Sequence, residues 1–198
     1  CDVVSFRRQY PAWLYSGSSD KDPSQSAVQV NAEYLIDPFY PWTWRQSGLH
    51  ILQNNTDLVV LQWWTTFWAF PFAYLSNWFH QHRVPFVYLV HNVLPHEEKP
   101  WDRVLVKLAL SRADGFIVQT PHEKERLLSL IPQARIEISP HPAYTMLADQ
   151  RVDKAQARQM LGLPPDQTVL LFFGIVRPYK GLKYLIEALS LLQSDGLT

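Results

Sequence analysis

Residues 86–131 read FVYLVHNVLPHEEKPWDRVLVKLALSRADGFIVQTPHEKERLLSLI and contain a pattern that recurs along the chain. Two short apolar runs, 86–90 and 115–119, have the length and the β-branched and aromatic content of buried strands. The stretches that follow them, 101–112 and 121–131, carry apolar residues at helical spacing. Strands that alternate with helices predict a parallel sheet whose strands are joined by helical crossovers.

The alternation continues on both sides of this stretch. Further strands are predicted at 3–6, 58–62, 136–139 and 169–173, and further helices at 42–53, 72–82, 154–161 and 182–193. One helix start carries a capping box, with Thr120 as the N-cap, Pro121 as the first helical residue and Glu123 as the third. The sequence therefore predicts an α/β fold of the Rossmann-like type, a parallel sheet with helices on both faces.

A change of organisation is predicted near residue 142. Ser139-Pro140-His141-Pro142 places two prolines around a histidine, which favours an extended connection. Residues 1–142 are expected to form one Rossmann-like lobe. Residues 143–198 are expected to hold a linker and the opening of a second lobe, because one strand and one helix bury too little apolar surface to fold alone. The chain is thus expected to be a piece of a longer protein.

The composition excludes several classes of protein. Of 198 residues, 47% are hydrophobic and 18% are charged, which excludes wholesale disorder. Lys plus Arg (18) equals Asp plus Glu (18), and the zero net charge argues against binding nucleic acid through bulk electrostatics. The single cysteine cannot form an internal disulfide, so a reducing, cytoplasmic compartment is expected. No P-loop, G-x-S-x-G, C-x-x-C or H-E-x-x-H motif occurs, and the scattered histidines predict no metal site.

Residues 58–82 contain no Asp, Glu, Lys or Arg and are long enough to cross a bilayer. Polar residues dilute this segment, however, and Pro71 near its middle would remove a helical hydrogen bond. The segment also divides into a short β-branched run and an amphipathic stretch, which favours a strand followed by a helix. Peripheral contact between the Trp-rich part of this segment and a membrane interface remains an alternative.

Residues 169–181, VLLFFGIVRPYKG, predict a buried strand that runs into a loop and then a helix. Arg177 and Lys180 would lie beyond the carboxyl end of the strand, beside a helix N-terminus that favours anions. Gly174 and Gly181 would let the backbone pass close to a ligand. These residues together predict a diphosphate site, and the alternative is a pair of solvated cations on a surface loop.

Three further groups of residues follow predicted strands. His91 follows the strand 86–90, at the edge of the sheet where ligands bind; the alternative is a histidine satisfied within the fold. Trp63 and Trp64 could stack on sugar rings or pack in the core. Arg7 and Arg8 could bind an anionic group or cap a loop.

The segment 174–181 ends in the pair Lys180-Gly181 and is followed by Leu-x-x-Leu-Ile-Glu-Ala-Leu at 182–189. This pattern resembles the start of the C-terminal lobe of retaining glycosyltransferases of family 4, which have the GT-B fold. The chain before it is similar to the N-terminal lobe of that family, most clearly at 88–97. The stretch 158–164 also fits the approach to the second lobe.

The resemblance implies transfer of a sugar from a nucleotide-sugar donor to an acceptor, with retention at the anomeric carbon and with no metal or other cofactor. It assigns His91 to the donor sugar near the reaction centre. The residues implied for the donor diphosphate are Gly174, Arg177, Lys180 and Gly181. The residues implied for the acceptor side are Arg7, Arg8, Trp63 and Trp64.

The chain departs from the family pattern in two ways. Ile175 stands where the family has an arginine directly after the glycine, and the arginine is Arg177. The Gly-rich first loop of the family would precede Cys1, and its paired glutamates would follow Thr198. We therefore expect a fragment with no transferase activity of its own. The competing hypothesis is a non-catalytic α/β module that binds a carbohydrate or a protein partner.

Overall fold

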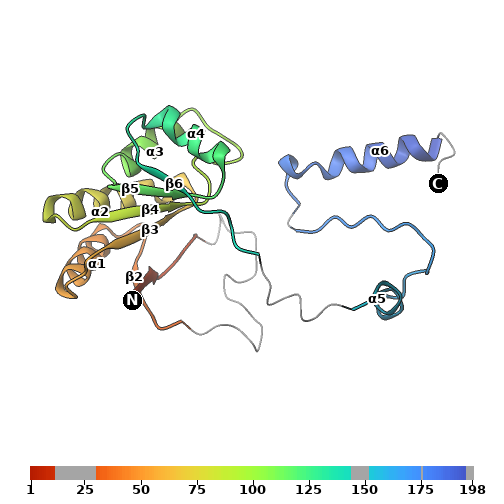
Figure 1. Ribbon diagram of the computed structural model, residues 1–198, viewed down its shortest axis with the longest axis horizontal. Coiled ribbons are helices and arrows are strands. Elements are labelled where there is room, and N and C mark those ends of the chain that lie inside the picture. The colour runs from red at the N-terminus through yellow and green to blue at the C-terminus, as the bar shows by residue number, and fades with distance from the viewer. Residues whose placement is uncertain (12–29, 144–151, 175, 195–198) are drawn as a thin grey trace. The chain divides into compact units, whose positions relative to one another are not determined.

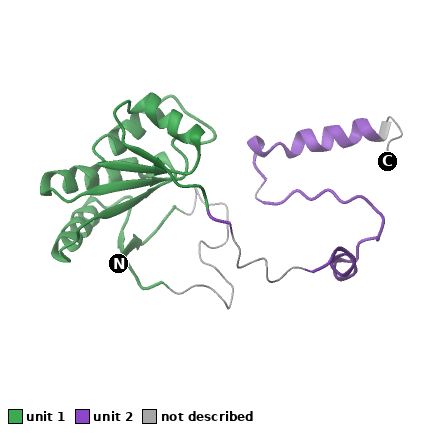
Figure 2. Ribbon diagram, viewed as in Figure 1, with its two compact units in different colours: residues 1–141 green, residues 142–198 purple. Residues whose placement is uncertain are grey.

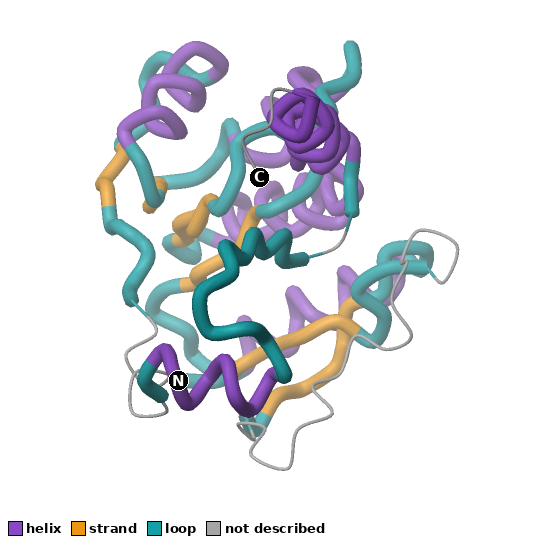
Figure 3. The backbone as a smooth tube through the Cα atoms, turned by 90° about the vertical axis from the view of Figure 1, so that its right-hand side faces the viewer, coloured by secondary structure: helices purple, strands orange, loops and turns teal. Residues whose placement is uncertain are grey.

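A computed structural model describes residues 1–11, 30–143, 152–174 and 176–194 of the chain (Figure 1). The chain forms two compact units, residues 1–141 and residues 142–198 (Figure 2). Figure 3 shows the same helices and strands from a second direction.

Unit 1 is built from parallel strands that alternate with helices. Its elements are β1 (Val3–Phe6), β2 (Ala32–Ile36), α1 (Pro41–Gln53), β3 (Val59–Trp63), the 3-10 turn η1 (Thr66–Trp68), α2 (Ala69–His82), β4 (Phe86–Val90), α3 (Asp102–Leu110), β5 (Gly115–Val118), α4 (Pro121–Leu130) and β6 (Ile136–Ile138). One parallel sheet has the order β3-β4-β5-β6, and β1 pairs with β2 in a second parallel sheet. The predicted Rossmann-like α/β class is confirmed.

The core of unit 1 lies where β3, β4 and β5 pack against helices. Burial alternates along β3: Val59, Leu61 and Trp63 are buried, whereas Val60 and Gln62 are exposed. This period of two matches the pleat of a strand. The buried helix residues that belong to the same core cluster come from α2, α3 and α4, and include Phe72, Leu75, Phe79, Val106, Ala109, Leu110 and Leu127.

The high aromatic content of the chain is explained mainly by this core. Trp63, Trp68, Tyr88 and Phe72 are among the largest fully buried side chains. The ring centroids of Trp63 and Tyr88 lie 6.4 Å apart at a right-angled, edge-to-face geometry, and Trp68 and Phe72 lie 5.9 Å apart. Such pairs contribute about 0.5–1.5 kcal/mol each beyond their buried area.

The charge-free segment 58–82 folds as β3, η1 and α2. Pro71 is the third residue of α2, in the first turn, where backbone N–H groups have no helical partner in any case. It therefore costs no hydrogen bond there, and the predicted division of this segment into a strand followed by a helix is confirmed. Over the described parts of the chain, no helix combines the length and the apolar character that a membrane crossing requires.

Two strand predictions were wrong. β2 was not predicted, because its apolar run, Tyr34-Leu35-Ile36, is short, and only Ile36 of this strand is buried. Residues 169–173 were predicted as a strand but are irregular, and Leu171 and Phe173 are 82% and 89% exposed. A strand needs a neighbour to pair with. The elements found among the described residues of unit 2 are helical: α5 (Lys154–Leu161), the 3-10 turn η3 (Pro178–Lys180) and α6 (Leu182–Ser194).

Candidate functional site

The carboxyl ends of the four parallel strands β3 to β6 lie at one edge of the sheet. Trp64, His91 and Gln119 are the first residues after β3, β4 and β5. The hydrogen bonding between β3 and β4 extends to the residue after β4: the His91 N–H donates to the Trp63 carbonyl at 2.9 Å. His91 and Gln119 are thereby neighbours, since Val90 and Val118 before them are paired in register.

The His91 ring is partly buried and makes a specific contact with Gln119. The Nε2 atom of Gln119 lies 3.3 Å from Nδ1 of His91. With the Gln119 amide placed this way, its nitrogen donates and Nδ1 accepts, which corresponds to the tautomer with the proton on Nε2. Burial, and to a lesser extent the charge of His141, lower the pKa of His91 below its usual value. Both effects favour a neutral imidazole at pH 7.

Glu123, near the start of α4, holds the turn that follows His91. Its Oε2 accepts a hydrogen bond from the Val93 N–H at 2.5 Å, and its side chain is buried. The Thr120 hydroxyl accepts from the Glu123 N–H at 3.2 Å, which confirms the N-cap half of the predicted capping box. The carboxylate, which the capping box would direct to the Thr120 N–H, instead ties α4 to the loop after β4. Sequence reasoning missed this second role of Glu123.

Replacing Glu123 by alanine is expected to lower the free energy of unfolding by about 1–3 kcal/mol, because the buried Val93 N–H loses its acceptor. Urea unfolding followed by circular dichroism measures the loss. Glu125→Ala on the exposed side of the same helix is the matched control and should change stability by less than about 0.5 kcal/mol. Equal losses in the two variants would contradict a structural role for the Glu123 carboxylate.

The predicted acceptor-side arginines both contact β2 or the turn after it. Arg7 donates through Nε to the Tyr34 carbonyl at 3.2 Å. Arg8 forms an ion pair with Asp37, with 3.1 Å between Nη2 and Oδ2. The Asp37 side chain is 4% exposed, whereas that of Arg8 is 46% exposed. Arg8 therefore compensates a buried carboxylate and still presents part of its guanidinium to solvent. Asp37 gave no signal in the sequence, because its partner is 29 residues away.

The two adjacent tryptophans have different environments. Trp63 is fully buried, and its Nε1–H donates to the Val93 carbonyl at 3.2 Å. Its prediction as an acceptor-side residue is corrected, because a side chain enclosed in the core cannot stack on a sugar. Trp64 is partly buried at the sheet edge, and its Nε1–H is hydrogen-bonded to the Tyr10 hydroxyl.

In unit 2, the loop that carries Arg177 and Lys180 contains two glycines with positive φ. Gly174 has a φ of 113° and Gly181 a φ of 74°, both in the range that favours glycine. A Cβ placed on Gly174 would lie 2.8 Å from Nζ of Lys180, so the ammonium group folds back over Gly174. Arg177 and Lys180 are exposed; Arg177 is the N-cap of η3 and Lys180 is its last residue, and Gly181 separates η3 from α6. Ile175 lies outside the described residues.

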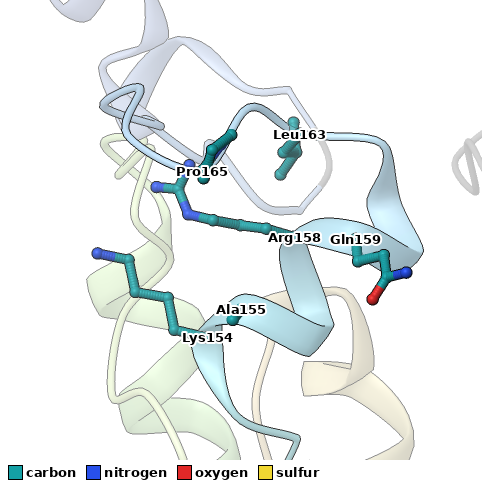
Figure 4. A pocket seen from close by; sticks show the side chains of 6 residues that line it. All are labelled: Lys154, Ala155, Arg158, Gln159, Leu163 and Pro165. Carbon is teal, nitrogen blue, oxygen red and sulfur yellow. The ribbon is translucent and has the colours of Figure 1, made fainter.

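A shallow pocket of about 370 Å³ lies between α5 and the loop that follows it (Figure 4). The side chains drawn around it are Lys154, Ala155, Arg158, Gln159, Leu163 and Pro165. The Arg158 guanidinium donates to the carbonyl oxygens of Pro164 and Gln167, so it fastens α5 to this loop. Among the described residues that line the pocket, we find none of the predicted site residues.

Metal ligands do not gather in the described ranges of the chain, where no group of three or more His, Cys, Asp or Glu side chains is placed to hold an ion. In unit 1, the predicted site residue His91 lies at the carboxyl edge of the sheet. In unit 2, the predicted cations Arg177 and Lys180 are exposed shortly before the N-terminus of α6.

Comparison with known proteins points to one family. The profile of Glycosyltransferase Family 4 matches residues 7–145. A D-inositol 3-phosphate glycosyltransferase of Mycolicibacterium gilvum is 33% identical over 97 residues, which is 48% of this chain and 22% of that protein. One of Streptosporangium roseum is 33% identical over 124 residues, 57% of this chain and 28% of that protein. One of Mycobacterium sp. strain KMS is 36% identical over 93 residues. The chain thus matches between 21% and 28% of the length of these relatives.

Proposed function

Because the chain belongs to glycosyltransferase family 4, we propose that it takes part in the transfer of a sugar from a nucleotide-sugar donor to an acceptor hydroxyl, with retention at the anomeric carbon. The match of the family profile over residues 7–145 is the observation that carries this proposal. In the proposed reaction the bond from the anomeric carbon to the diphosphate breaks, and a bond from that carbon to the acceptor oxygen forms. The nucleoside diphosphate leaves with the bonding electrons, and the acceptor hydroxyl gives its proton to the departing diphosphate or to solvent.

The proposed diphosphate site is the loop of Gly174, Arg177, Lys180 and Gly181. Negative charge grows on the diphosphate as the sugar departs, and cations already in place stabilise that charge. The positive end of α6, which begins at Leu182, adds to this effect. The fold of the Lys180 ammonium over Gly174 supports the assignment, since it keeps the cation at the backbone where a phosphate oxygen could approach.

His91 is proposed to contact the donor sugar through its Nε2–H. His91→Ala in the full-length protein is expected to lower kcat about tenfold, a loss of about 1.4 kcal/mol of transition-state stabilisation, and to change donor affinity less. Steady-state rates and donor titrations on the same samples separate the two effects. His80→Ala, on the exposed side of α2, is the control and should leave both unchanged. Reduced affinity with unchanged kcat would remove His91 from the reaction centre.

The acceptor is proposed to bind at the edge of unit 1 after β1 and β3, beside Arg7, Arg8 and Trp64. The exposed part of the Arg8 guanidinium suits an acceptor that carries negative charge, and the names of the relatives include a phosphorylated inositol. A cytoplasmic location is proposed on the basis of the single cysteine, Cys1. If the acceptor is linked to a lipid, the protein is proposed to contact the membrane surface that holds this acceptor.

The direct test incubates the full-length protein with UDP- and GDP-sugars and candidate acceptors, and measures release of the nucleoside diphosphate. The anomeric configuration of the product, read by NMR, tests retention. Acceptor-dependent release supports the proposed transfer. Binding of sugars or sugar nucleotides without any release would favour the non-catalytic binding module.

A further inference from the structure

Gln119 and His91 form a pair that the family match does not assign. Both residues come directly after paired strands, β4 and β5, so their backbones are held side by side by the sheet. The Ser139 N–H donates to the Val118 carbonyl at 2.8 Å, which fixes the backbone before Gln119 from its other side. The 3.3 Å contact between Gln119 Nε2 and His91 Nδ1 is therefore made by two side chains on rigid supports.

We propose that Gln119 is a positioning residue that holds His91 in its neutral tautomer with the proton on Nε2. The amide donates to Nδ1, and a protonated Nδ1 could not accept that bond. The tautomer and the ring orientation are thus set together, and Nε2–H becomes a hydrogen-bond donor with a defined direction. That this donor faces the nucleotide sugar rests on the function proposed above. The proposed tautomer of His91 does not depend on that function.

An amide is suited to this role in a way that a carboxylate is not. A carboxylate at residue 119 would accept from Nδ1–H, would draw the proton to that nitrogen and would raise the pKa of the ring. The ring would then become an imidazolium at higher pH and would attract the anionic diphosphate itself. Among the described residues, His141 lowers the pKa of His91, and the Glu123 carboxylate, which holds the turn after His91, is directed to the Val93 N–H.

The test is a pH titration of the ¹⁵N-labelled chain by NMR, in which long-range couplings identify the protonated ring nitrogen of each histidine. Wild-type His91 is expected as the Nε2–H tautomer. Gln119→Glu is expected to move the proton to Nδ1 and to raise the pKa of His91. Gln119→Met, which keeps the size without the polar group, is expected to give a mixture of the two tautomers. Gln81→Glu on the exposed end of α2 is the matched control and should leave the His91 signals in place.

A wild-type ring protonated on Nδ1, or a His91 titration that is the same in wild type and Gln119→Glu, would overturn the proposal. If Gln119→Glu does not fold, the tautomer of His91 in Gln119→Met still tests the proposal. In the full-length protein, Gln119→Met should lower kcat about fivefold, the effect of one ordinary hydrogen bond, with little change in the donor KM. Gln119→Glu should move the acid limb of the pH profile to higher pH. If the NMR results hold while neither variant changes kcat, the proposed role of His91 in the reaction fails, and the tautomer assignment stands.

Discussion

Trp63→Ala is expected to lower the free energy of unfolding of the chain by about 3–5 kcal/mol, the usual cost of removing a large aromatic side chain from a core. Trp63 is fully buried, and its ring lies near those of Phe72 and Tyr88, at 6.2 Å and 6.4 Å. The substitution also leaves the Val93 carbonyl without its indole donor. Domains of this size are stable by about 5–15 kcal/mol, so the variant should unfold at much lower urea concentration.

Val60→Ala is the matched control, because Val60 lies on the same strand but is 53% exposed. Its effect should stay within about 0.5 kcal/mol. Trp63→Phe should be milder than Trp63→Ala and gives a folded variant if the alanine variant does not accumulate. A fully folded Trp63→Ala chain with wild-type stability would contradict the core assignment and would return Trp63 to the acceptor-side candidates.

Lys180→Ala is expected to weaken the binding of a nucleoside diphosphate by about 1.5–3 kcal/mol, or about 10- to 150-fold, the range for hydrogen bonds to charged groups. The ammonium group lies against Gly174 and directly before the N-terminus of α6. Its removal takes away a charge–charge contact that no neighbouring group of the same loop reproduces at that position. Calorimetric titration of the full-length protein with UDP, GDP and ADP measures the change for the nucleotide that binds.

Lys183→Ala is the control for charge alone. Lys183 is three residues further on, on the first turn of α6, and pairs with Glu187 at 3.6 Å. Its substitution also removes one positive charge but should change affinity by less than threefold, since its side chain is 82% exposed and paired along the helix. Equal losses in the two variants would show that Lys180 acts through net charge, and unchanged affinity in Lys180→Ala would remove it from the site.

Most elements of unit 1 could be predicted because their signals are local. Strands such as β4 and helices such as α4 carry their own hydrophobic period and, for α4, their own cap. β2 carries no such signal and exists because β1 lies beside it. Residues 169–173 have the local signal, an apolar run, but do not form a strand. Among the described residues of unit 2, no neighbouring strand is found for them to pair with.

The candidate site was predictable only at its most local level. His91 is identifiable from its place after a strand, and Lys180 from the residues on either side of it. The groups that determine how His91 and the neighbouring turn behave, Gln119 and Glu123, are 28 and 30 residues from their partners. No spacing rule connects residues so far apart, because the crossover between two strands can have many lengths.

The sequence by itself therefore determined the α/β class, the positions of most strands and helices and the resemblance to a family, since all of these depend on neighbours along the chain. The tertiary structure decided which of two adjacent tryptophans is enclosed, which carboxylate Arg8 compensates and which side chain meets Nδ1 of His91. These outcomes depend on contacts between strands and helices that only the folded sheet brings together. For the same reason, of the two tryptophans that the sequence offered as a possible binding surface, Trp63 belongs to the core of unit 1 and Trp64 is partly buried against that core.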